Sequence, residues 1–152
     1  MLLEDKVFSR LDELFFNAEE TKREIAEYKS CRRADAFYSA DPTGKEALEA
    51  VATVEHWRGI DQPELWLKAI ENTWEKCKSK DNYIYKTMRM RYVLHKNWTQ
   101  ICFIQCISTN TYFRWRKEFL LFALVEATRL NIGVYKIIDQ EQEDMEATNV
   151  HA

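Results

Sequence analysis

The sequence predicts an all-α protein, and three observations support this fold class. The chain of 152 residues contains only three glycines and two prolines, and these residues stand where helices are expected to end. Apolar residues recur with the three- and four-residue spacing of amphipathic helices. The hydrophobic fraction of 46%, including 13% aromatic residues, can supply a buried core. We expect an N-terminal helical region (1–80), a helix-turn-helix module (81–138) and a disordered acidic tail (139–152).

The N-terminal region is expected to begin with two helices separated by the segment Asp41-Pro-Thr-Gly44. The first helix should span about residues 4–38, because its apolar residues lie mostly along one stripe. Its length suits a hairpin arm or a dimer contact, although packing on the next helix would also explain it. The second helix should span about residues 45–58 and end at Gly59. Its expected buried residues are Leu48, Val51 and Val54.

A third helix is expected to begin at Pro63, the first helical position, and to continue to about Cys77. Asp61 and Glu64 have the spacing of a capping box at its start. The polar segment 78–82 then separates the two regions, and a fourth helix should span about residues 83–95.

Two capped helices are expected after residue 96. Asn97 can cap a short helix that starts at Trp98, and Ser108 can cap a longer one that runs toward Asn131. Gly133 should follow the longer helix as a C-terminal stop. The short connection at residues 106–108 makes the pair a candidate helix-turn-helix.

Charge is distributed unevenly along the chain. Residues 83–136 contain nine bases and two acids, whereas residues 1–82 contain 13 bases and 18 acids, and residues 137–152 contain five acids and no base. A basic segment between acidic flanks is typical of a phosphate-binding module, although a chance cluster of solvated charges would give the same count.

The helix after Ser108 has two different faces. With 3.6 residues per turn, Arg114 and Lys117 lie within about 40° of Asn110. Aromatic residues occupy the opposite side: Tyr112, Trp115, Phe119 and Phe122. Asn can pair with adenine and Arg with guanine in the major groove, whereas Lys can bind guanine or phosphate. We therefore expect the polar face to enter the groove and the aromatic face to pack on the preceding helices.

This interpretation gives a set of candidate DNA-contacting residues on and around the two helices. They are Lys96, Thr99, Gln100, Thr109, Asn110, Phe113, Arg114 and Lys117. Double-stranded DNA is the expected partner, and no cofactor is expected.

The second half of the same helix, Phe119 to Leu130, is apolar on nearly every side. A surface helix of a three-helix module could not bury such a surface. Leu121, Leu124 and Val125 therefore need a second partner, which residues 1–80 of the same chain or of a second chain could supply. We expect this helix to connect the two regions, and we expect a homodimer.

At these residues the sequence resembles the ArpU/RinA-like phage late transcriptional regulators. The similarity rests on several short motifs over about residues 20–135: Ser39-Ala-Asp-Pro-Thr-Gly44, Pro63-Glu64-x-Trp66, Arg91-Tyr92, Trp98-x-x-Ile101, Ile107-Ser108-x-x-Thr111-Tyr112-Phe113-Arg114-x-Arg116, and Ala123. The resemblance implies a sigma-region-4-like helix-turn-helix, activation of phage packaging or lysis genes with the host RNA polymerase, and no enzymatic activity.

The sequence departs from this family around the turn, at Cys102, Gln105 and Cys106. Phe103 and Ile104 are apolar where a bare helix-turn-helix has a solvent-facing surface. We therefore expect another helix to cover Phe103 and Ile104.

Other functions are less well supported by the sequence. It contains no glycine-rich phosphate loop, no GxSxG motif and no cysteine pair with zinc-ligand spacing, so neither an enzyme nor a metal site is expected. No segment has the ~20 apolar residues needed to cross a bilayer, and a cytoplasmic protein with reduced cysteines is expected. A small terminase-type packaging protein and a helical adaptor without DNA binding remain alternatives.

Overall fold

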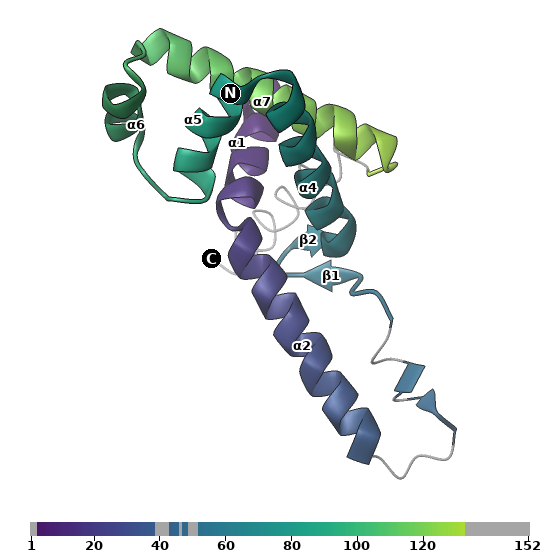
Figure 1. Cartoon of the computed structure of the whole chain (residues 1–152). Coiled ribbons are helices and arrows are strands. Elements are labelled where there is room, and N and C mark those ends of the chain that lie inside the picture. The colour runs from purple at the N-terminus through teal and green to yellow at the C-terminus, as the bar shows by residue number, and fades with distance from the viewer. Residues whose placement is uncertain (1–2, 39–42, 46, 49–51, 133–152) are drawn as a thin grey trace, which may run out of the picture.

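The computed structural model describes residues 3–38, 43–45, 47–48 and 52–132, which are predominantly helical (Figure 1). The prediction of an all-α protein is confirmed. The elements follow one another as α1 (Leu3–Phe16), α2 (Ala18–Tyr38), β1 (His56–Trp57), β2 (Ile60–Asp61), α4 (Pro63–Lys80), α5 (Asn82–Tyr92), α6 (Trp98–Gln105) and α7 (Thr109–Arg129).

The expected first helix is divided at Asn17 into α1 and α2. Asparagine has a low helix propensity. The backbone hydrogen bonds on either side nevertheless continue, from Asn17 N to Glu13 O (3.1 Å) and from Thr21 N to Asn17 O (2.9 Å). The two helices therefore follow one another almost without interruption, but they pack on different parts of the protein. Helix α1 packs on α5 and α7, whereas α2 packs on α4 and extends away from the helical body (Figure 1).

The prediction of a second helix over about residues 45–58 is wrong for its C-terminal half. Residues 52–55 are not helical, and residues 56–61 form a two-stranded antiparallel hairpin. Arg58 and Gly59 both have positive φ angles (47° and 78°), which is the requirement of a two-residue type I′ turn. Gly59 therefore makes a hairpin turn instead of ending a helix. The expected burial of Leu48 is also wrong, because this side chain is exposed, whereas Val51 lies outside the described residues.

The start of α4 also differs in part from the prediction. Pro63 is its first residue, as expected, but the N-cap is Gln62, which has a left-handed conformation (φ 51°) and makes no side-chain capping bond. Asp61 belongs to β2 instead of a capping box. Glu64 accepts a hydrogen bond from the backbone N–H of Val54 (2.8 Å), so it connects the helix to the segment before the hairpin.

The predicted positions of the C-terminal helices agree closely with the structure. Asp81 caps α5 by accepting hydrogen bonds from the N–H groups of Tyr83 and Ile84. Asn97 and Ser108 cap α6 and α7, as expected from the sequence. The predicted stop at Gly133 and the predicted tail 139–152 lie outside the described residues.

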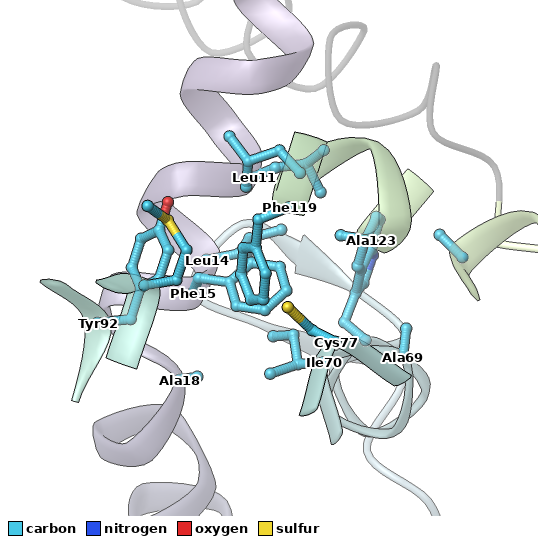
Figure 2. Close-up of a cluster of buried hydrophobic side chains, with 14 of the residues drawn as sticks. Leu11, Leu14, Phe15, Ala18, Ala69, Ile70, Cys77, Tyr92, Phe119 and Ala123 are labelled. Atoms are coloured by element: carbon cyan, nitrogen blue, oxygen red, sulfur yellow. The ribbon is translucent and has the colours of Figure 1, made fainter. Parts of the chain in front are cut away.

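The hydrophobic core receives side chains from both sides of the predicted boundary at residue 80. Phe119 of α7 is fully buried, and its ring lies 5.0 Å from Phe15 of α1, 4.7 Å from Trp74 of α4 and 5.8 Å from Tyr92 of α5 (Figure 2). The Phe15 contact is edge-on, the Trp74 contact is tilted and the Tyr92 contact is stacked, and offset or edge-on arrangements are favourable for aromatic rings. Helix α7 therefore connects the two halves of the chain, as predicted.

The connection uses a different face of α7 from the one expected. Leu120, Ala123 and Ala127 are buried against the other helices. Leu121 and Val125 remain 43% and 48% exposed, and Leu124 is partly buried. The expectation that Leu121 and Val125 pack on residues 1–80 of the same chain is therefore wrong for the described residues.

Candidate nucleic-acid interface

Helices α6 and α7 are joined by a connection of three residues at one end of the molecule (Figure 1). Helix α6 ends at Cys106, which has a left-handed conformation (φ 53°, ψ 46°) and donates its N–H to the carbonyl groups of Cys102 and Phe103. Ser108 then starts α7 by accepting a hydrogen bond from the N–H of Thr111 (3.1 Å). The two helices contact each other and both contact α5, so the start of α7 is held in place by two neighbours.

The start of α6 is held by a reciprocal capping box. The Asn97 side chain accepts a hydrogen bond from the N–H of Gln100 (2.9 Å), and the Gln100 side chain accepts one from the N–H of Asn97 (3.3 Å). The predicted DNA-contacting residue Gln100 therefore also has a structural task, which occupies its side-chain oxygen. Thr99 is exposed on the same helix, and Lys96 is partly exposed just before it.

The first half of α7 has the two faces that the sequence predicts. Thr109, Asn110 and Arg114 are exposed. On the opposite side, Tyr112 and Phe119 are fully buried. The burial of the aromatic face fixes the rotation of the helix, so Asn110 and Arg114 must point into solvent.

The other two predicted residues of this face have neighbours within the protein. Phe113 is 42% exposed, and its ring lies 6.0 Å from that of Trp98 at the start of α6. The Lys117 ammonium lies 5.9 Å from the centre of the Phe8 ring of α1. Trp98 was not among the predicted site residues, although it is 43% exposed and borders this surface. Helix α1 thus limits the candidate surface at Lys117.

A cluster of buried charge lies behind this surface. Asp12 of α1 accepts hydrogen bonds from Arg91 (3.0 and 2.8 Å), from the Tyr92 hydroxyl (2.6 Å) and from Arg116 (3.1 Å). Burial raises the pKa of Asp12, but the hydrogen bonds from Arg91 and Tyr92 and the charge of Arg116 outweigh it, so the pKa is lowered. The carboxylate is therefore ionised at neutral pH and forms ion pairs with two arginines.

This cluster reduces the number of cations that the basic segment can present to a ligand. Arg91 and Arg116 are engaged with Asp12, and Arg129 pairs with Glu126 (3.2 Å), which also pairs with Lys76. Lys86, Arg89 and Arg114 are exposed. The pairings of Asp12 have no local signal in the sequence, because Asp12 is 79 and 104 positions away from its two arginines.

The expectation that another helix covers Phe103 and Ile104 is wrong for the described part of the chain. Phe103 is 85% exposed and Ile104 is 47% exposed on the outer side of α6. Phe103 follows Thr99 by one helical turn, so the candidate surface carries an exposed aromatic side chain beside its polar residues.

Two further properties of the described residues bear on the class of protein. Among them, no three His, Cys, Asp or Glu side chains are grouped so that they could hold a metal ion. No helix in this part of the chain combines the length and apolar character needed to span a membrane.

Comparisons of the chain with protein-family models, with curated proteins and with solved structures found no match. The motif resemblance described above therefore stays an expectation, and a functional proposal must rest on the geometry of the surface itself.

Proposed function

We propose that this chain is a sequence-specific DNA-binding protein that uses the start of α7 to read the major groove. The observation that carries the proposal is the exposed polar face of Asn110 and Arg114 on a helix whose other face is fixed in the core. An amide and a guanidinium group are the side chains best suited to bidentate contacts with adenine and guanine.

The elements around this face support the same proposal. A short capped helix, a three-residue connection and a second capped helix follow one another at α6 and α7. In a helix-turn-helix, the first helix crosses the backbone and the second enters the groove with its N-terminal residues. Thr99 and Lys96 would then contact phosphates, and Thr109 would lie at the edge of the groove.

The biological role we propose is regulation of transcription. The motif resemblance suggests activation of phage late genes together with the host RNA polymerase. The exposed Phe103 is a candidate contact for such a protein partner, because large exposed apolar side chains are favoured at protein interfaces. This narrower role depends on the DNA-binding proposal and adds to it.

The first experiment is selection of bound sequences from a random pool of duplexes by the full-length chain. We expect enrichment of a short motif. We also expect log affinity for it to fall against log salt by about 0.9 per phosphate contact. A flat salt response together with no enriched motif would rule out this function and leave the helical adaptor. Occurrence of the enriched motif next to a packaging origin instead of a promoter, in the DNA that encodes the chain, would favour the terminase-type alternative.

A pair of arginine variants on the same helix tests the assignment of the reading face. Arg114→Ala should weaken binding to the selected site by about 10- to 100-fold, because a bidentate base contact contributes about 1–3 kcal/mol. Arg129→Ala removes another exposed cation, which lies at the far end of α7 and pairs with Glu126, and should weaken binding less than about threefold. Equal effects of the two substitutions would show that Arg114 contributes charge alone. Circular dichroism should confirm that both variants are folded.

A further inference from the structure

A groove of about 550 Å³ lies between α2 and α4. Its apolar floor contains Ile25 of α2 and Leu67, Ile70 and Trp74 of α4. Helix α2 contributes residues of one stripe, from Ala18 through Lys22, Ala26 and Lys29 to Arg33. The groove is therefore as long as about four helical turns, which is the shape that receives another helix.

The direction of the two helices is fixed by contacts at each end of the groove. Lys29 of α2 pairs with Glu64 at the start of α4, and Phe15, just before α2, contacts Trp74 near the end of α4 (6.0 Å). The helices are thus antiparallel. Beyond Lys29, α2 projects away from the body (Figure 1), and its last two side chains, Phe37 and Tyr38, are 82% and 84% exposed.

We propose that the groove holds α2 of a second copy of this chain, antiparallel to the first α2. Charge complementarity carries the choice of partner. The groove-lining charges at the Ala18 end are three acids and one base (Glu19, Lys22, Glu71 and Glu75), whereas those at the Arg33 end are three bases and one acid (Lys29, Arg33, Glu64 and Lys68). An antiparallel pair places the basic end of each α2 at the acidic end of its partner's groove, whereas a parallel pair would place like ends together.

The two-fold axis of such a dimer passes close to residues 25 and 26, midway between the first and last groove-lining positions of α2. Arg33 of the partner then lies opposite Ala18, at the end of the groove that carries Glu19, Glu71 and Glu75. Lys22 faces Lys29, whose charge is already balanced by Glu64 within each chain.

The same register explains the exposed aromatic tip of α2. Phe37 and Tyr38 of the partner lie opposite residues 13 and 14, just beyond the end of the groove at Ala18. Three exposed or half-exposed apolar side chains belong to the adjoining segments: Phe16 (37% exposed) at the end of α1, Val93 (41%), which lines the groove, and its neighbour Leu94 (56%). The dimer therefore covers five apolar side chains in each chain that would otherwise face water. Its formation does not depend on DNA binding.

Replacement of either of two alanines of α2 by glutamate provides a matched test by sedimentation equilibrium of the full chain. Ala26 is exposed, lines the groove and lies at the axis, whereas Ala34 is exposed, lies about 80° further around the helix and is not among the groove-lining residues. We expect the unaltered protein to be dimeric at micromolar concentrations. Ala26→Glu should raise the dimer dissociation constant at least roughly tenfold, about 1.4 kcal/mol, because it adds two like charges at the axis. Ala34→Glu should change it less than about threefold.

A disulfide experiment tests the register. In a Cys31→Ser background, Lys22→Cys combined with Lys29→Cys should give a disulfide-linked dimer on mild oxidation. These positions are about 10.5 Å apart within one helix, too far for a bond within a chain. The control, Arg23→Cys with Ser30→Cys, has the same spacing but lies about 100° around α2 from the first pair and outside the groove lining, so it should stay unlinked.

Four results would overturn the proposal. If the full chain is a monomer at all concentrations up to about 10⁻⁴ M, no second copy occupies the groove. If Ala26→Glu and Ala34→Glu weaken the dimer equally, the dimer interface is not centred on the groove. Equal cross-linking of the two cysteine pairs would exclude the antiparallel register. A monomer that dimerises only when residues 133–152 are deleted would show that the C-terminal segment, instead of a second copy, occupies the groove.

Discussion

Arg114 and Arg116 are two residues apart on α7, yet they belong to different regions of the molecule. Arg114 is exposed on the outer face, whereas Arg116 points inward and donates a hydrogen bond to Asp12 of α1 (3.1 Å). The outer face is built from groups that a ligand can reach, and the inner face from groups that hold the helices together. A count of basic residues in the sequence treats the two arginines as equal, but only the outer one can contribute to phosphate or base contacts.

The largest expected effect concerns the inner face. Phe119→Ala should lower the free energy of unfolding by about 3–5 kcal/mol, because this fully buried ring contacts aromatic side chains of three other helices. Urea denaturation of the full chain measures the loss. The partly buried Trp115 should cost less on substitution by alanine. A Phe119 variant with unchanged stability would show that the core is not organised around this ring.

A second, smaller effect concerns the buried charges behind α7. Breaking a fully buried ion pair costs about 3–5 kcal/mol, and the residual exposure of this cluster reduces the expected loss for Asp12→Asn to about 2 kcal/mol. The carboxylate side chain is 16% exposed. In the Asp12→Asn variant, Arg91 and Arg116 keep their charge without a carboxylate partner. Urea denaturation at pH 7 should therefore show a lower free energy of unfolding.

The pH dependence of the same variant gives an independent check. The pKa of Asp12 is lowered in the folded protein, whereas an unfolded aspartate has a pKa of about 3.9. Its stabilising contribution is therefore fully present above about pH 4 and is lost as the pH falls through the lowered folded pKa. The stability difference between the unaltered protein and Asp12→Asn should shrink over this acidic range. A difference that stays constant with pH would contradict the ion pair.

The junction between the two helices should be less sensitive. Ser108→Ala removes the side-chain oxygen that accepts the Thr111 N–H, and loss of such a cap costs about 1 kcal/mol. Ser108→Asp, which keeps an acceptor at the same position, should recover most of the stability in thermal unfolding. Failure of the aspartate to recover stability would indicate that the serine acts through another contact.

The smallest effect is expected on the outer face. Arg114→Ala should change the free energy of unfolding by less than about 0.5 kcal/mol, as is usual for an exposed side chain away from caps and core contacts. Arg116→Ala, measured in parallel, should be clearly more destabilising because it removes a hydrogen bond to a buried carboxylate. Equal losses would remove the distinction between the two faces.

Local patterns in the sequence predicted most of the helical architecture. The caps at Asn97 and Ser108 and the division of α7 into two faces depend on residues within a few positions of one another, so they can be read without knowing the tertiary structure. The hairpin at residues 56–61 was missed because apolar spacing over a short segment also fits a helix. Its determining feature is a pair of positive φ angles at Arg58 and Gly59.

The candidate surface could be predicted only in part for a related reason. Asn110 and Arg114 are exposed as expected, because helix periodicity and an aromatic face determine their direction. The engagement of Lys117 with Phe8 and the exposure of Phe103 depend on where α1 lies relative to α6 and α7. Such relations between distant segments are not encoded in any local spacing.

The contact between Asp12 and Arg116 joins residues separated by 104 positions. Because Phe15 of α1 packs against Phe119 of α7, α1 can complete its packing only after α7 has been synthesised. Closing so long a loop carries an entropic penalty and slows folding relative to a bundle with local contacts. During synthesis, part of the apolar surface of α1 therefore stays uncovered until α7 is available, and this interval is when the nascent chain depends most on protection from aggregation.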